Sequence, residues 1–322
     1  MKSYTITEND AGQRLDKFLT KAVPRLPQSQ LYKYLRIKRV KCNHKRCEPS
    51  YKLQVGDLLE LYINDDYFNE PDTPLSFLRA PSKISVVYED SHVLLADKPC
   101  GMLVHEDDEE KDDTLIHRIQ HYLYAKGQYH PEEEHSFAPA LCNRIDRNTS
   151  GIVIAAKDAA SLRVLNDKIK NRELQKLYLC IVLGHLDKKE DTLLGYHTKD
   201  AETNTVKILP YKTEGAKTAL TQYRVLDENR RYSLVEVNLL TGRTHQIRAH
   251  MASIGHPLLG DTKYGLNRDS KGTGYRFQAL CSYKLAFRFT TPAEHLDYLN
   301  GRTFQLEDCQ LLTDFYGKLA AL

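Results

Sequence analysis

Residues 143–151 read Asn-Arg-Ile-Asp-Arg-Asn-Thr-Ser-Gly and run directly into the apolar stretch Ile-Val-Ile-Ala at 152–155. A polar segment that ends in glycine before β-branched residues predicts a loop followed by a buried strand. Asp146 is therefore expected at the edge of a sheet, between two arginines that favour its ionised form. Taken alone, this composition favours a structural ion pair, and Asp146 is only a candidate for chemistry.

Apolar runs on both sides of this loop predict the rest of a sheet. Their β-branched residues place strands at 84–96, 151–156, 176–183, 219–225 and 232–240. Two short helices interrupt them, one capped by Asp158 and one by Thr244, and the second carries Ile247, Met251 and Ile254. Strand runs interrupted by isolated helices are typical of an α+β fold.

The chain as a whole has the size and composition of a two-domain globular protein. It has 322 residues, of which 41% are hydrophobic and 28% charged, and this excludes fibrous and wholly disordered classes. No stretch resembles a secretory leader or a membrane span. The seven cysteines form no paired framework and no zinc spacing, so we expect a cytoplasmic protein without a metal site.

The first 63 residues predict a separate small domain. Leu15, Phe18, Leu19 and Ala22 have the spacing of an amphipathic helix, and a second helix capped by Ser29 leads into the basic run 36–39. A strand pair turning at 43–44 and a further strand within 55–63 complete this unit.

This small unit is strongly basic. From Arg14 to Lys52 it contains twelve lysines and arginines against Asp16 and Glu48, a density that suits a phosphate backbone. A solvated basic face without a ligand is the alternative. Residues 64–81, rich in proline and acids, predict a linker to the second domain at 82–322, and the acidic blocks 106–113 and 132–134 predict solvated loops.

The stretch at 143–151 resembles the signature of the RluA-like family of RNA pseudouridine synthases, which is His-Arg-Leu-Asp, two variable residues and Thr-Ser-Gly. Only Asn143 and Ile145 differ from it. Further blocks that resemble the family follow in the same order along the chain, at 97–105, 176–182, 216–221, 241–250, 256–261 and 263–265. A series of blocks is far more specific than one short motif. Residues 278–285 depart from the family, which usually has Leu-His-Ala before its leucine.

Residues 1–63 resemble the alpha-L RNA-binding domain named after a small-subunit ribosomal protein. His44 stands at the turn where that domain has glycine, and histidine tolerates a left-handed backbone better than most residues. The two resemblances together imply a small two-helix and sheet domain followed by a large mixed, mainly antiparallel sheet of pseudouridine synthase type.

The resemblance implies that Asp146 attacks the ribose of a uridine, or takes a proton from it. The uracil then leaves its nitrogen linkage, rotates and rejoins through carbon 5. Every atom of the product is already present in the substrate, so the family needs no cofactor and no metal. The target base must first leave its stack.

The resemblance also assigns the other site residues. Arg248 pairs with the catalytic carboxylate, Tyr178 stacks on the base, Ile247 lines its pocket, and Arg144 fills the space of the flipped base. Tyr178 and Ile247 could instead be ordinary core residues, and Arg144 a phosphate contact. His245 and His250 are five residues apart and share no helix face, so we expect His245 to be a cap or packing residue. The basic residues expected to contact RNA are Arg14, Lys33, Arg36, Lys38, Arg39, Lys41, Lys45 and Arg46.

Three other functions stay open at this point. A non-catalytic RNA-binding or ribosome-assembly factor would keep the fold and lose turnover. The same isomerase could act on transfer RNA, although the resemblance favours large-subunit ribosomal RNA. A hydrolase using Ser150 is disfavoured because the sequence around it lacks the nucleophile elbow. We expect the protein to act as a monomer, with RNA as its partner and no membrane contact.

Overall fold

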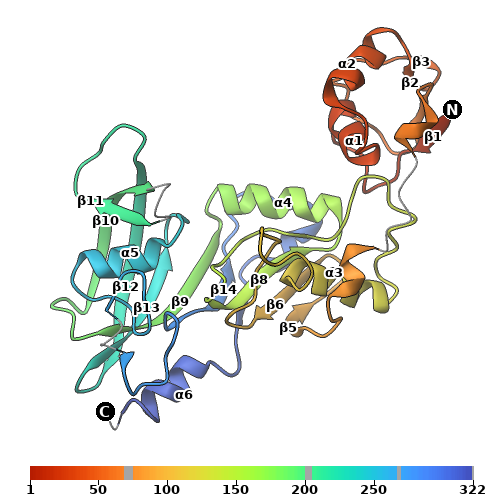
Figure 1. Cartoon of the computed structure of the whole chain (residues 1–322). Helices are drawn as coiled ribbons and strands as arrows, with labels where there is room; N and C mark the ends of the chain where they lie inside the picture. Colours follow the sequence, from red (N-terminus) through yellow and green to blue (C-terminus); the bar gives the residue numbers. More distant parts are fainter. Residues whose placement is uncertain (69–74, 200–204, 267–269, 321–322) are drawn as a thin grey trace.

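The computed structural model describes residues 1–68, 75–199, 205–266 and 270–320, which fold around two separate β-sheets. The amino-terminal sheet is antiparallel, with strand order β1-β4-β2-β3. It consists of β1 (Lys2–Thr5), β2 (Val40–Cys42), β3 (Lys45–Arg46) and β4 (Leu58–Leu61), with helices α1 (Leu15–Ala22) and α2 (Gln28–Arg36) beside it (Figure 1). The predicted two-helix and sheet domain is therefore confirmed.

The helices of this domain follow from local sequence, with one correction. Leu15, Phe18 and Leu19 of α1 are buried in the domain core, as their spacing predicts. The second helix begins at Gln28, directly after Pro27, so the predicted cap at Ser29 was wrong. The carbonyl of Pro27 accepts the first helical hydrogen bond, from the N–H of Leu31, so Ser29 already lies inside the first turn.

The turn between β2 and β3 lies at Asn43 and His44, as predicted. Both residues are left-handed, with φ of 51° and 63°, which matches the twist of a two-residue hairpin. The side chain of Asn43 donates to Asp57 and accepts from the backbone N–H of Leu58. These two hydrogen bonds stabilise the turn, although it lacks the usual glycine.

The large sheet has eleven strands in the described part of the chain. Nine follow the order β11-β10-β12-β13-β9-β14-β8-β6-β5, while β7 pairs with β8 and β15 with β14. Only β8 and β14 pair in parallel, which confirms a mixed, mainly antiparallel sheet. The bounds are β5 (Ser85–Glu89), β6 (Val93–Lys98), β7 (Ala140–Leu141), β8 (Ser150–Ala156), β9 (Leu174–Leu183), β10 (Glu190–Lys199), β11 (Val206–Leu209), β12 (Lys217–Glu228), β13 (Tyr232–Leu239), β14 (Leu280–Phe287) and β15 (Thr303–Gln305).

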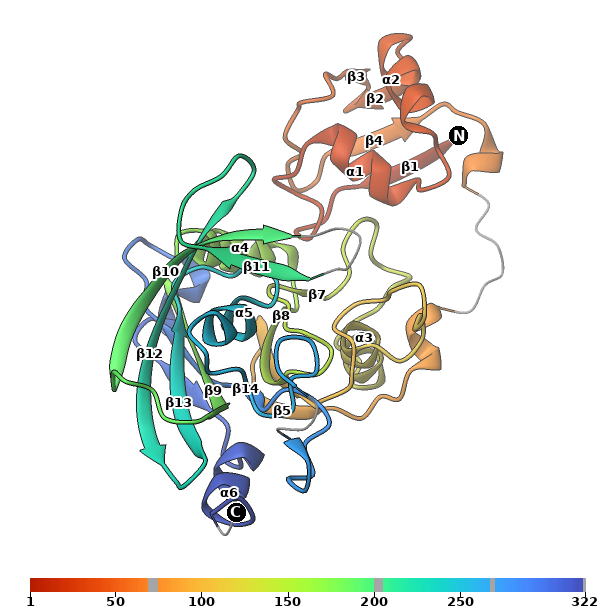
Figure 2. The same cartoon turned by 60° about the vertical axis from the view of Figure 1, so that its left-hand side comes forward.

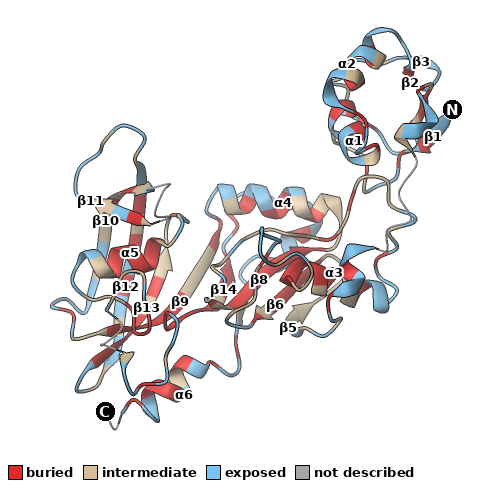
Figure 3. Cartoon of the chain, viewed as in Figure 1, coloured by how far each residue is buried: buried red, intermediate tan, exposed pale blue. Residues whose placement is uncertain are grey.

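Helices cover both faces of this sheet, because alternate strand residues point to opposite sides. Tyr178 and Cys180 of β9 pack with α5 (Gln246–Ser253), whereas Leu179 and Ile181 belong to the core shared with α4 (Ala159–Lys170) and α6 (Gln310–Tyr316). Helix α3 (Leu115–Ala125) lies on the same face as α5, farther along the sheet (Figures 1 and 2). Burial is concentrated in the central strands between these layers (Figure 3).

Several elements differ from the sequence prediction. The strand expected at 84–96 is two strands, because Asp90 accepts hydrogen bonds from the backbone N–H groups of His92 and Val93 and closes a turn. Asp158 caps α4 as predicted, through the N–H of Ser161. Thr244 does not cap α5, where His245 occupies that position. Helix α3 was missed, although Thr114 caps it through the N–H of His117.

The two domains touch through polar side chains. Asn9 donates to Glu134 at 2.6 Å and accepts from the N–H of Ala159 at the start of α4. Ser136 donates to Asp10 and accepts from Gln13. Within the predicted linker, 69–74 lie outside the described residues, and the following turn at Ser76–Arg79 buries Phe77 against α3. No helix in the described ranges is long and apolar enough to cross a membrane.

Candidate active site

The loop that carries Asp146 connects β7 to β8, and a buried lysine forms hydrogen bonds with its backbone. Lys98 is fully buried at the end of β6, and its ammonium donates to the carbonyl oxygens of Pro99, Met102 and Arg147. Burial lowers its pKa to about 8, against the attraction of Cys100 and Asp146. The three acceptors match the three donors of an ammonium group, so the loop backbone is fixed directly beside Asp146.

The two ends of this loop are also fixed. Asn143 accepts a hydrogen bond from the N–H of Ile154 at 2.8 Å, so this departure from the family signature still shapes the loop. At the other end, Thr149 donates its N–H to the carbonyl of Asp146 and accepts at its hydroxyl from Gln278. Gln278 lies just before β14, in the segment that departs from the family pattern, and supports the loop through this contact.

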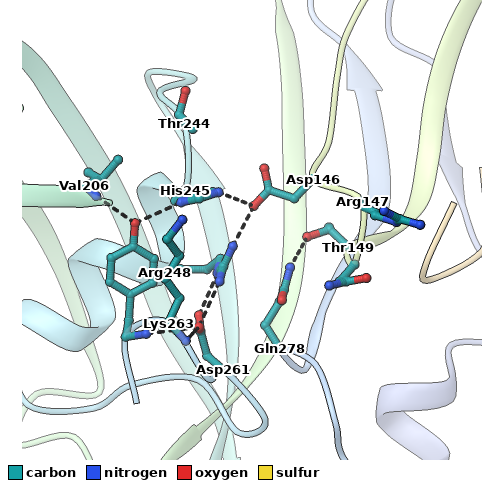
Figure 4. A network of polar contacts seen from close by, with 12 residues as sticks. Asp146, Arg147, Thr149, Val206, Thr244, His245, Arg248, Asp261, Lys263 and Gln278 are labelled. Carbon is teal, nitrogen blue, oxygen red and sulfur yellow. Dashed lines mark hydrogen bonds and ion pairs between the residues drawn. The ribbon is translucent and has the colours of Figure 1, made fainter. Parts of the chain in front are cut away.

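Asp146 and Arg248 form the expected ion pair. Arg248 comes from α5 and donates from Nη1 to Oδ2 of Asp146 at 3.3 Å (Figure 4). Its stronger partner is the buried Asp261, which accepts from Nε at 2.6 Å and from Nη2 at 2.9 Å. Burial opposes the charge of Arg248, but the two carboxylates outweigh it and raise the pKa of the guanidinium. Arg248 therefore stays charged beside Asp146.

The structure brings the other predicted substrate contacts to the same cleft. Tyr178 of β9 and Ile247 of α5 are almost wholly buried and line it, and burial raises the pKa of Tyr178 to about 12. Arg144 lies on the loop beside Asp146, with its side chain at the cleft. Two apolar side chains and a long cation thus line the cleft that contains Asp146.

This cleft is large and basic. Its volume is about 1400 Å³, enough for several nucleotides rather than one small molecule. Nine lysines and arginines line it against the acids Glu106, Asp107 and Asp146, and they are Arg144, Arg147, Lys170, Arg172, Lys176, Lys199, Arg243, Arg248 and Lys263. That excess of positive charge attracts a polyanion.

Comparison with known proteins agrees with this geometry. A family model described as RNA pseudouridylate synthase matches residues 92–253, and an S4 domain model matches residues 13–59. Ribosomal large subunit pseudouridine synthase C of Vibrio cholerae is 32% identical over 295 residues, which cover 89% of this chain and 88% of the relative. The chain belongs to the RNA pseudouridylate synthase family.

Other members and solved structures give a consistent picture. The Escherichia coli K12 protein of the same name is 31% identical over 297 residues, covering 91% of this chain and 89% of the relative. Human RNA pseudouridylate synthase domain containing 1 shares the fold with a TM-score of 0.54 and 23% identity, covering 76% of this chain and 96% of that one. At this identity the similarity to the human structure shows that the two chains share a fold.

Sequence reasoning missed part of this synthase's site. His245 places its ring between Asp146 and Tyr264 rather than acting as a side-chain cap (Figure 4). Its position three residues before Arg248, at the start of the same helix, was an available signal. Lys170 and Arg172 gave no signal, because they lie in no motif, and Lys176 lies in the block 176–182 but was not assigned to the site. His250 points elsewhere and bonds Thr221.

The basic residues of the S4 domain are mostly exposed. Lys33, Arg36, Lys38, Arg39, Lys45 and Arg46 have exposed side chains, while Lys41 is half-buried over the ring of Tyr62. Arg14 is exposed but forms a two-bond ion pair with the buried Asp16. That pair gives Arg14 a structural partner, in addition to its expected role toward RNA.

One cluster in the described residues has side chains of the kind that bind metals. His92, Asp158 and His295 lie within 4.8 Å of one another at the start of α4, away from the cleft lining. Their polar atoms already bond to each other directly or through Ser161, as a helix-cap network. The sequence analysis predicted no metal site at these residues. Their hydrogen bonds to one another explain why the three side chains lie close together.

Proposed function

We propose that this synthase converts uridine to pseudouridine in large-subunit ribosomal RNA, with Asp146 as its catalytic carboxylate. The observation that carries the proposal is the placement of Asp146 in a basic cleft. Arg248 holds one of its oxygens, and the other accepts no hydrogen bond from the described residues. An ionised carboxylate with one unused oxygen is suited to attack the ribose or to remove its proton. The named relatives support the choice of RNA.

The neighbouring side chains fit the steps of an isomerisation. Once the glycosidic bond to uracil nitrogen 1 breaks, the base must turn while it stays bound, and it then bonds through carbon 5, which loses its hydrogen. The ring of Tyr178 and the side chain of Ile247 provide an apolar wall against which the base can stack and turn. Arg248, which also pairs with Asp261, keeps a positive charge beside Asp146.

Access to the ribose requires the uridine to leave its stack, at a cost of a few kcal/mol. Arg144 is a long cation on the same loop as Asp146, so it can occupy the space that the base leaves. A contact with a phosphate is the alternative role. The exposed cations of the S4 domain, together with Arg14 and Lys41, would bind the RNA backbone around the target.

We also propose the division into residues 1–63, a linker at 64–81 and a catalytic domain at 82–322, acting as a cytoplasmic monomer. The separate cores and sheets support the two domains. All seven cysteines are unpaired, which suits a reducing compartment.

The deciding experiment is a map of pseudouridine in ribosomal and transfer RNA from cells that lack the gene. Carbodiimide adducts stop reverse transcription at each site, and the strain is complemented with wild type or Asp146→Asn. We expect particular stops in large-subunit RNA to vanish and only wild type to restore them. If stops vanish from transfer RNA instead, transfer RNA is the substrate and large-subunit ribosomal RNA is not. An unchanged map would favour a binding factor without turnover.

A further inference from the structure

His245 adopts an unusual backbone at the start of α5. Its φ of 52° and ψ of 22° are left-handed, a conformation that costs energy for any residue with a Cβ atom. Neighbouring contacts hold it there. His197 of β10 donates from Nε2 to the carbonyl of Thr244, and Gln246 accepts from the N–H of Arg243. Strain maintained by its surroundings points to a role for the side chain that it places.

The two ring nitrogens of His245 face Tyr264 on one side and Asp146 on the other, and Figure 4 shows the side toward Asp146. Its Nδ1 is 2.9 Å from the hydroxyl of Tyr264, and its Nε2 is 3.8 Å from Oδ2 of Asp146. The same Oδ2 receives the hydrogen bond from Arg248. Arg248 of α5 and His245 at the N-cap of the same helix thus approach the same carboxylate oxygen.

The hydrogen bonds of Tyr264 decide where the imidazole proton lies. The backbone N–H of Val206 already donates to the tyrosine hydroxyl at 3.0 Å. The hydroxyl therefore donates its own proton to Nδ1 of His245, which acts as the acceptor. Nε2 then carries the imidazole proton and faces Asp146. The opposite tautomer would turn a lone pair toward a carboxylate. Burial lowers the pKa of His245, although Asp146 attracts its charged form, which fits a neutral ring.

We propose that His245 is a positioning residue whose neutral Nε2–H, set by the hydroxyl of Tyr264, holds Oδ2 of Asp146 together with Arg248. This inference rests on the proposed function. The carboxylate then cannot turn its oxygens freely, and Oδ1 alone is presented to the ribose. At 3.8 Å the Nε2 contact is longer than a hydrogen bond in this structure, and we expect it to shorten to hydrogen-bond length when RNA is bound.

Two substitutions of the same histidine separate this role from a purely structural one. His245→Gln puts an amide N–H near the position of Nε2, whereas His245→Asn reaches only the position of Nδ1. Asparagine, however, suits the left-handed backbone better than glutamine. If His245 matters only for its backbone conformation, His245→Asn should lower the rate less than His245→Gln. If His245 donates to Asp146, His245→Gln should lower the rate less than His245→Asn.

The rate is measured in single turnovers of the full chain on a large-subunit ribosomal RNA transcript tritiated at carbon 5 of uridine. Isomerisation releases this tritium. We expect His245→Asn to lower the rate about 10- to 100-fold, the range for a hydrogen bond to a charged group, with unchanged RNA affinity. His245→Gln should recover most of the rate. Equal rates for the two variants, or a faster Asn variant, would overturn the proposal.

A second measurement needs no turnover. In protein carrying nitrogen-15 histidine, the His245 signals are assigned by their loss in His245→Gln, and their shifts report which nitrogen holds the proton. We expect the Nε2–H form in wild type and a mixture of tautomers in Tyr264→Phe. An Nδ1–H form in wild type would overturn the proposal, whatever the RNA target. Activity retained by Asp146→Asn would instead overturn the proposed function.

Discussion

Gly151 has no room for a side chain. It directly precedes the apolar part of β8, has φ of 108°, and a Cβ atom there would lie 2.2 Å from the carbonyl oxygen of Ser282 on the parallel strand β14. A side chain could not fit without moving one of the two central strands. The glycine of the signature is thus explained by the close approach of β8 and β14 behind the catalytic loop.

We predict that Gly151→Ala lowers the free energy of unfolding by about 3 kcal/mol or more, the sum of a left-handed Cβ and an overpacked contact. Gly127→Ala is the matched control, because Gly127 also has positive φ but has open space around its Cβ position. It should cost only about 1 kcal/mol. Urea denaturation measures both. Similar losses at the two sites would mean that the strand contact adds nothing.

Single residues also show what the sequence could predict of the site. The signature placed Asp146 in a loop before a strand, and the block at 241–250 placed Arg248 beside it. Adjacent residues specify the first prediction, whereas the pairing of Arg248 with Asp146 joins residues 102 apart and came only from the resemblance to the family. The contact of His245 with Tyr264 depends on a left-handed turn and on a segment distant in sequence, and no local pattern specifies either.

At the scale of elements, α5 is the helix that organises the site, since it carries His245, Ile247 and Arg248. His250 attaches the far side of this helix to β12 through the hydroxyl of Thr221, at 2.7 Å. Burial, with a smaller contribution from His197, lowers the pKa of His250 to about 4. The ordinary value in an unfolded chain is about 6.5.

These values predict an acid-sensitive anchor for α5. Between about pH 6.5 and pH 4 the unfolded chain binds the proton at His250 and the folded chain does not, so stability is lost as pH falls. We expect wild type to lose about 3 kcal/mol more over this window than His250→Gln. Denaturation at several pH values measures the difference, with the exposed His185→Gln as control. A parallel loss in wild type and His250→Gln would refute the anchor.

Elements were predicted unevenly, and the reason is physical. The strands β8, β9 and β13 have buried apolar runs, β12 alternates buried with exposed residues, and all four were predicted. The hairpin of β10 and β11 lies at the edge of the sheet with polar and exposed residues, so its pattern is weak. The cleft itself depends on cations from several elements, and only the folded chain brings them together.

At the scale of the whole molecule, positive charge is divided between the cleft and the S4 domain. If the S4 cations bind phosphates, Lys38→Gln and Arg39→Gln together should weaken RNA binding. The salt slope of log Kd should fall by about 0.7–0.9 for each phosphate that is no longer neutralised. The rate at saturating RNA should not change. Lys83→Gln, at an exposed lysine outside the cleft lining, is the control. An unchanged slope would show that these cations face solvent only.

The contact between the domains decides whether these two basic surfaces act as one. Ser136 donates to the buried Asp10 at 2.6 Å and accepts from Gln13 at 2.7 Å, so it joins the large domain to the first loop of the S4 domain. Removal of its hydroxyl leaves a buried carboxylate short of a donor. We predict that Ser136→Ala loosens the S4 domain, increases the radius of gyration in X-ray scattering, and weakens RNA binding severalfold while the rate at saturation is kept. Ser253→Ala, on the exposed end of α5, is the control. If the radius of gyration and the RNA affinity of Ser136→Ala both equal the wild-type values, the remaining contacts of Asn9 and Arg163 are sufficient to hold the two domains together.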